Sequence, residues 1–211
     1  MLGYLDRFSV DLDFDLLEGV NNKLLRKEFY RVFEAAHLSV KDESKKVLEF
    51  FVNYDALAGE RNTIKIDALG NSVASNQYKA QFLPEIDRMA NCQTIETMFA
   101  NKLVALTDRF KIHKTIAGRD IYDIHHFYIK GYSYHPTIIT ERTGMSVTDY
   151  LQFLTAFIEK HITQRVIDED LNTLLPSDVF RHIRTHLTRE TIMFIRDDVA
   201  RWIKKETCHG Y

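Results

Sequence analysis

The chain contains few cysteines and few residues that interrupt secondary structure. Among its 211 residues are 2 Cys, 3 Pro, 8 Gly and 1 Trp. Cys92 and Cys208 lie far apart in sequence, so we expect no disulfide framework. We therefore expect a reducing, cytoplasmic location. No Cys or His spacing is typical of a zinc site, because the adjacent pair His125 and His126 cannot share one helical face. Low Gly and Pro content agrees with a compact, helix-rich chain.

Long hydrophobic runs and a strong net charge are also absent. No apolar stretch approaches 18 residues and no charged-then-apolar leader is present, so we expect no membrane span and no secretory signal. The formal net charge of −2 argues against a protein that coats nucleic acid non-specifically. Basic residues between positions 181 and 205 are interpreted as a solvated helix face, with a local nucleic-acid patch as the alternative. The composition, 45% hydrophobic and 27% charged, indicates a soluble globular protein of one domain or two small ones.

Acids alternate with large apolar residues close to the N-terminus. Because a strand directs alternate side chains to opposite faces, one face would carry Asp11, Asp13 and Asp15. The other face would carry the apolar residues Val10, Leu12, Phe14 and Leu16. Neighbouring carboxylates on one face lie about 6 to 7 Å apart, a spacing that suits Mg²⁺ together with substrate phosphates. The alternative is an edge strand with a solvated acidic face.

A second acid lies at the end of another predicted strand. Residues 63–69 are rich in β-branched side chains and their alternation ends at Asp67, a candidate third metal ligand. We expect this strand to form an antiparallel hairpin with residues 47–54 through a turn at 58–60. Between the acidic strand and this hairpin, residues 23–37 have the spacing of an amphipathic helix.

The rest of the chain is predicted to be helical. A polar segment at 70–81 and a turn at Pro84 precede a helix at about 94–110, and no strand is predicted after it. Ser146, Pro176 and Thr188 mark the starts of further helices. The predicted organisation is an α/β region at 1–90, followed by a helical region at 91–211.

Two clusters of charge lie on these predicted helices. Lys102 and Arg109 lie two turns apart beside an apolar stripe, which suits a triphosphate, although such a pair is more often a solvated surface. Asp120 and Asp123 are spaced i, i+3 and therefore share a helix face. An acid in the first turn of a helix is favoured by the helix dipole, which explains one of these residues without a catalytic role. It explains the presence of both less readily.

Taken together, four motifs resemble the AbiEii family of nucleotidyltransferase-like toxins of bacterial abortive-infection toxin–antitoxin systems. They are Arg7-x-Ser9-x-Asp11-x-Asp13-Phe14, the strand ending in Asp67, the run from Asn101 to Arg109, and Arg119-Asp120-x-Tyr122-Asp123. The resemblance spans residues 7 to about 130. It implies an α+β chain, with a minimal nucleotidyltransferase fold built on a mixed sheet and followed by an all-helical C-terminal region.

The resemblance also implies an activity and a set of partners. The expected enzyme uses Mg²⁺ or Mn²⁺ and a nucleoside triphosphate to add nucleotides to RNA, in some members to transfer RNA, and it has a cognate antitoxin. By matching position, Asp11 and Asp13 would hold metal and Asp67 would be the third carboxylate. Lys102 would contact the triphosphate, with Arg7, Ser9 and Arg109 as further substrate-binding residues. Asp120 or Asp123 would complete the catalytic set.

The sequence departs from the family pattern at one point. The family places a Gly-Gly or Gly-Ser/Thr turn upstream of the acidic strand, where backbone N–H groups receive phosphate. Only Gly3 precedes that strand here, so we expect a chain truncated at its N-terminus relative to the family. The alternative function is therefore a catalytically inactive relative that acts as a protein-binding or regulatory module. A third is a phosphohydrolase that uses the same acids.

Overall fold

The chain forms two compact units. The computed structural model describes residues 5–9, 11–57, 62–70, 73–84 and 86–208. The first unit, Phe8–Ala74, is called the sheet unit, and the second, Met1–Arg7 with Ser75–Tyr211, is called the helical unit. The chain thus passes from one unit to the other directly after Arg7 and again after Ala74. The two regions expected from the sequence, 1–90 and 91–211, stay a prediction.

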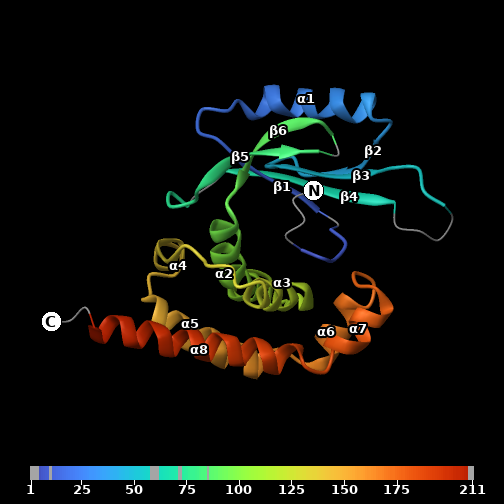
Figure 1. Ribbon diagram of the computed structural model, residues 1–211. Coiled ribbons are helices and arrows are strands. Elements are labelled where there is room, and N and C mark those ends of the chain that lie inside the picture. The colour runs from blue at the N-terminus through green and yellow to red at the C-terminus, as the bar shows by residue number, and fades with distance from the viewer. Residues whose placement is uncertain (1–4, 10, 58–61, 71–72, 85, 209–211) are drawn as a thin grey trace. The chain divides into compact units, whose positions relative to one another are not determined.

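The sheet unit is built on a mixed four-stranded sheet, in the order β1-β4-β3-β2. Its strands are β1 (Asp11–Leu16), β2 (Ser39–Glu43), β3 (Leu48–Asn53) and β4 (Thr63–Gly70). β1 pairs with β4 in parallel, whereas β3 pairs with both β4 and β2 in antiparallel fashion. Helix α1 (Asn22–Ala35) lies along one face of this sheet (Figure 1). The predicted helix at 23–37 and the predicted antiparallel strand pair are therefore confirmed.

Alternation along the strands determines which face of the sheet α1 covers. A core of buried side chains lies between them, composed of Phe33, Leu48, Phe50, Val52, Ile66 and Ala68. Leu12 and Leu16 of β1 pack against this core, as the apolar face of the acidic strand predicts, whereas Phe14 is 51% exposed. Val10 and the predicted turn at 58–60 lie outside the described residues. The opposite face of the sheet is left for the charged side chains.

The helical unit contains a two-stranded antiparallel sheet and a series of helices. The strands are β5 (Tyr78–Leu83) and β6 (Arg88–Gln93). The helices are α2 (Ile95–His113), α3 (Gly118–Ile129), α4 (Pro136–Thr143), α5 (Val147–His161), α6 (Gln164–Leu171), α7 (Ser177–Ile183) and α8 (Leu187–Cys208). The long helix α8 packs along α5 and also against α3 (Figure 1). Phe99 and Leu103 of α2 and Ile121 and Ile124 of α3 are fully buried.

The α+β class, with a mixed sheet and helices toward the C-terminus, is confirmed, but some strands were missed. Residues 70–81 were described only as a polar segment before the turn at Pro84, whereas β5 begins at Tyr78 and pairs with β6. Strand β2 was not predicted at all. Two predicted helix starts are borne out, since the Ser146 side chain accepts a hydrogen bond from the Asp149 N–H and α7 begins directly after Pro176. The third helix, α8, begins at Leu187, one residue before the predicted Thr188.

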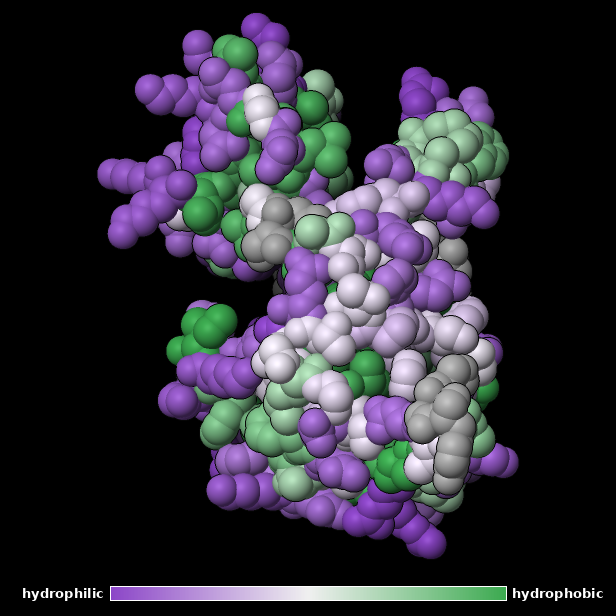
Figure 2. Space-filling model, turned by 90° about the vertical axis from the view of Figure 1, so that its left-hand side faces the viewer, coloured by the Kyte–Doolittle hydropathy of each residue, from purple (hydrophilic) through white to green (hydrophobic). Residues whose placement is uncertain are grey.

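The outer surface carries mixed side chains. Hydrophilic residues are interspersed with hydrophobic ones over the face shown in Figure 2, as is usual for a folded protein. None of the helices described combines the length and the apolar character required for a membrane span.

Candidate active site

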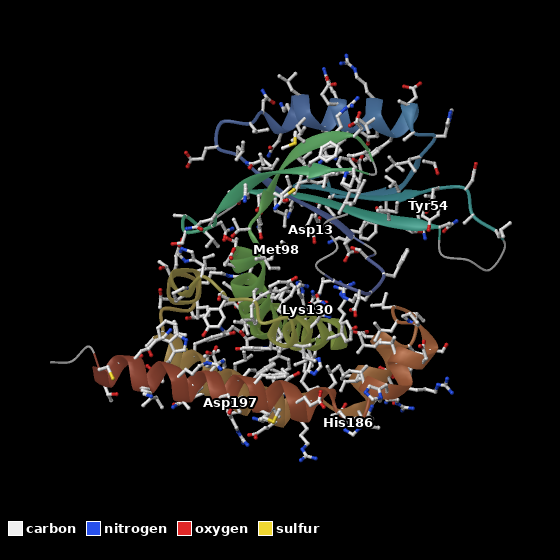
Figure 3. The ribbon with its side chains drawn as sticks, in the orientation of Figure 1. Asp13, Tyr54, Met98, Lys130, His186 and Asp197 are labelled. Atoms are coloured by element: carbon white, nitrogen blue, oxygen red, sulfur yellow. The ribbon has the colours of Figure 1, made fainter. Side chains whose placement is uncertain are left out.

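The acids of β1 and β4 lie side by side on the face of the sheet opposite α1. In the parallel register, Asp13 is the partner of Asp67, and Asp11 is the partner of Lys65. Asp13 lies on β1 (Figure 3). Paired residues on neighbouring strands point to the same face, and adjacent strands lie about 4.8 Å apart. The three acids expected to hold metal are therefore brought onto one surface.

The two carboxylate oxygens of Asp67 differ in their hydrogen bonding. Its Oδ2 accepts a hydrogen bond from the Lys65 ammonium, which also pairs with Glu49 Oε2 at 2.8 Å. Its Oδ1 is buried and has no hydrogen-bond partner among the described residues. A buried carboxylate oxygen without a donor is costly, so this atom is available to a ligand.

Glu49 and Lys65 belong to the same surface and were not identified from the sequence. Glu49 on β3 is the register partner of Asp67. Burial alone would lower the pKa of Lys65, but its hydrogen bonds to Asp67 and Glu49 hold it above the ordinary value. The hydrogen bond from Lys65 in turn lowers the pKa of Glu49. Alternation within Lys65-Ile66-Asp67 was the signal that places Lys65 on the acidic face.

The carboxylates on this face have the chemistry to bind a divalent cation, but they do not yet surround a metal-binding position. Carboxylate oxygens are the ligands that Mg²⁺ prefers, and within the described part of the chain Asp67 Oδ1 has no hydrogen-bond partner. No group of three His, Cys, Asp or Glu side chains in the described ranges is arranged closely enough to hold a metal ion. Asp11, Asp13 and Asp67 would thus hold a metal only after their side chains converge on it.

In the helical unit, Lys102 lies between two buried carboxylates. Its Nζ is 3.1 Å from Asp120 Oδ1 and 2.9 Å from Asp123 Oδ2. Both aspartates are fully buried, whereas the Lys102 side chain is 30% exposed. The i, i+3 spacing of the acids on α3 produces this arrangement, because it directs both toward the same side chain of α2.

Two arginines complete this cluster. Arg109 Nε lies 3.2 Å from Asp120 Oδ2, and the Arg109 side chain is 35% exposed. Arg7 donates from Nε to Asp123 Oδ1 at 2.6 Å and from Nη2 to Asp123 Oδ2 at 2.7 Å. Three cations therefore surround two carboxylates, and two of those cations are partly exposed.

Two groups of the cluster have pKa values shifted in favour of their charged forms. Burial alone would lower the pKa of the Lys102 ammonium, but the carboxylates of Asp123 and Asp120 hold it above its ordinary value. Burial would raise the pKa of Asp120, yet Lys102 and Arg109 lower it overall. Lys102 and Arg109 are the partly exposed cations of the cluster, and exposed cations of this kind attract a polyanion.

The remaining predicted residues have local roles. Ser9 Oγ donates to the backbone carbonyl of Asp11 at 3.3 Å. Among the C-terminal basic residues, Arg184 pairs with Asp168, Arg196 with Glu159 and Arg201 with Asp198. These pairs favour the interpretation of a charge-balanced, solvated helix face.

The fold and these two residue sets define an α+β protein that carries acids on a parallel strand pair and a lysine held by buried carboxylates. A family model described as "Nucleotidyl transferase AbiEii toxin, Type IV TA system" matches residues 1–196, and the chain belongs to this family. The resemblance found in the sequence is thereby confirmed. No curated protein and no solved structure matches the chain.

Proposed function

We propose that the protein is a metal-dependent nucleotidyltransferase toxin that transfers a nucleotide from a nucleoside triphosphate to RNA, with transfer RNA as the first acceptor to test. One observation carries this proposal. The parallel register of β1 and β4 brings Asp11, Asp13 and Asp67 onto one face, where Asp67 Oδ1 has no hydrogen-bond partner among the residues that the structure describes. Membership of a toxin family supports the toxin role, and a cognate antitoxin follows from it as a proposed partner.

The residues of the sheet unit are assigned to the metal. Asp11, Asp13 and Asp67 would hold Mg²⁺ or Mn²⁺, ions that prefer carboxylate oxygens. When bound, the ion would neutralise charge on the triphosphate. Lys65 orients Asp67 by holding Oδ2, which directs Oδ1 away from that contact.

The residues of the helical unit are assigned to the phosphates. Lys102 and Arg109 are the partly exposed cations of the cluster, and an ammonium acts on a phosphate as a compact point charge. Asp120 orients both cations, because its two oxygens contact Lys102 and Arg109 separately. Positioning and charge stabilisation are the main protein contributions in phosphoryl chemistry.

One observation favours the inactive alternative. The single ammonium of Lys65 already pairs with both Asp67 and Glu49 and offsets part of their negative charge, so the acidic face has a resident cation before any metal binds. A binding or regulatory module of nucleotidyltransferase ancestry would retain such a face without performing transfer.

The test is an incorporation assay with matched variants. The purified protein is incubated with Mg²⁺, each labelled nucleoside triphosphate and total transfer RNA, beside Asp13→Asn and Asp15→Asn. Asp15 is the matched control because it follows on the same strand face but has Leu69, not an acid, as its register partner. We expect label in RNA from the parent and from Asp15→Asn, and a loss of about a hundredfold or more in Asp13→Asn.

Other results separate the alternatives. Equal incorporation by Asp13→Asn and the parent would reject the metal assignment. Release of inorganic phosphate without incorporation would identify a phosphohydrolase. A parent that performs neither reaction would leave the binding or regulatory role.

A further inference from the structure

Asp6 and Arg7, the last two residues before the sheet unit begins, both contact side chains of α3. One of the two is acidic and the other basic. Arg7 forms a bidentate ion pair with Asp123, through contacts of 2.6 and 2.7 Å. The preceding residue, Asp6, accepts a hydrogen bond from the Tyr122 hydroxyl at 2.6 Å, and its Oδ1 lies 3.2 Å from His126 Nδ1. We call these contacts of Asp6 and Arg7 with α3 the N-terminal clamp.

Burial makes the Arg7 half of the clamp the stronger half. The Arg7 side chain is 8% exposed and the Asp123 side chain 0%, whereas the Asp6 side chain is 58% exposed. Bidentate guanidinium–carboxylate pairs fix orientation as well as distance. A buried carboxylate that loses its cation is strongly destabilised, so Arg7 is firmly retained at this position.

The hydrogen bonds of Asp123 distinguish it from Asp120. Asp123 Oδ1 receives Arg7 Nε, and Oδ2 is contacted by both Arg7 Nη2 and Lys102 Nζ. The partners of Asp123 thus include a deeply buried arginine. Asp120, in contrast, contacts the two cations that are about a third exposed, Lys102 and Arg109.

We propose that Asp123 is a positioning residue, the receptor of the N-terminal clamp, and that Arg7 acts as a tether and does not bind substrate. The proposal rests on the proposed function, since it assigns a role within that site. The chain enters the sheet unit directly after Arg7, and β1 begins at Asp11. Within the helical unit, Arg7 shares Asp123 Oδ2 with Lys102, so a fixed Arg7 limits the movement of Asp123 and of the Lys102 ammonium that it contacts. Restricting that movement lowers the entropic cost of aligning reacting groups.

The first test is proteolysis, which does not depend on activity. Trypsin cleaves after arginine, and the clamp protects Arg7 by burial. We expect Asp123→Asn to accelerate cleavage between Arg7 and Phe8 by about tenfold or more, because cleavage follows the population of the open segment. Intact mass spectrometry detects the loss of residues 1–7. Asp168→Asn is the matched control, because it removes the acid from another arginine pair of the helical unit and should leave cleavage at Arg7 unchanged.

Two outcomes would overturn the clamp. One is an unchanged cleavage rate at Arg7 in Asp123→Asn, and the other is an equal increase at every arginine. If Asp123→Asn fails to fold, Asp6→Ala decides, since it removes only the exposed half and should still accelerate cleavage selectively.

The second test distinguishes a tether from a substrate ligand. For Arg7→Met we expect kcat to fall about tenfold or more while KM for the triphosphate changes less than about twofold. A rise in KM with unchanged kcat would identify Arg7 as a substrate ligand and overturn the proposal. So would recovery of activity in Arg7→Ala on adding free guanidinium at concentrations well below denaturing ones, because free guanidinium replaces the charge and not the tether.

The failures of the two proposals are distinguishable. Selective cleavage in Asp123→Asn together with an inactive parent would reject the proposed transferase and retain the clamp as a structural device. An active parent whose cleavage does not respond to Asp123→Asn would retain the transferase and reject the clamp.

Discussion

At the scale of single residues, the candidate site depends on which partner each carboxylate has. Asp67 shares its charge with Lys65, Asp120 with Lys102 and Arg109, and Asp123 with Arg7 and Lys102. A buried carboxylate depends on its cationic partners, and removing one partner of such a pair is strongly destabilising. These partners explain why acids of similar sequence context receive different roles.

Asp120 should make stability depend on pH. Its pKa lies below the ordinary value of 3.8, because Lys102 and Arg109 offset the effect of burial. A carboxyl with a lower pKa in the folded state contributes stability that is present above the unfolded pKa and is lost as pH falls toward the folded pKa. We expect Asp120→Asn to be about 3 kcal/mol less stable than the parent near neutral pH. On acidification below about pH 4, the variant should lose less additional stability than the parent does, because it lacks this carboxyl.

Urea unfolding of parent and Asp120→Asn at a series of pH values measures both effects. The two stability curves should approach each other as pH falls below the ordinary carboxyl pKa. Parallel curves over the whole acidic range would show that Asp120 does not contribute through its ionised form.

The sequence predicted these residues better than it predicted their partners. The i, i+3 spacing of Asp120 and Asp123 correctly indicated a shared helix face, and both acids contact Lys102. The sequence did not distinguish the role of Asp120 from that of Asp123. The distinction depends on the contact of Asp123 with Arg7, which lies 116 residues away in the sequence. Contacts of that range follow from the packed chain and not from a local pattern.

At the scale of elements, one glycine controls how closely α3 and α6 approach. A Cβ atom at Gly118 would lie 2.6 Å from the carbonyl oxygen of Val166 and 3.1 Å from the Cα of Ile167. The Gly118 N–H also donates to Asp170 Oδ2 at 2.6 Å. Both contacts are to α6, so the first turn of α3, which carries Asp120, is positioned by this helix.

Gly118→Ala should therefore destabilise the helical unit. We expect a loss of about 2 kcal/mol, because the atoms in the way are backbone and cannot rotate aside. Gly70→Ala is the matched control, since a Cβ at Gly70 would meet nothing within 4 Å. The urea concentrations at the unfolding midpoints measure the stability of both variants. Equal midpoints for Gly118→Ala and the parent would mean that α6 can shift to make room for the added Cβ without loss of stability.

Strands with a buried face were predictable, and strands without one were not. β1 and β4 alternate visibly because one face packs on the core. β5 buries only Leu83, and β2 has no fully buried side chain and contains a register shift between Val40 and Asp42. Strand propensity reflects packing on a half-buried surface, so polar strands held mainly by backbone pairing have no clear sequence signal.

At the scale of the whole molecule, the two units have separate hydrophobic cores. In the sheet unit Phe50 is fully buried, and its ring centroid lies 5.3 Å from those of both Phe29 and Phe33. In the helical unit the buried side chains belong mainly to α2, α3 and α5, as in Leu103 and Leu151. A core that is complete within one unit permits that unit to unfold as a cooperative block.

Phe50→Ala should consequently loosen the sheet unit selectively. Removing a buried phenylalanine costs about 3 to 5 kcal/mol, a large part of the stability of a small unit. We expect amide hydrogen exchange to accelerate in β1, β3, β4 and α1, while α2, α3 and α5 keep the protection of the parent. Leu151→Ala is the reciprocal control, because it should accelerate exchange in the helical unit first. If either variant accelerated exchange equally in both units, the chain would unfold as one cooperative whole, and the Asp13→Asn assay would then need a folding control covering both units.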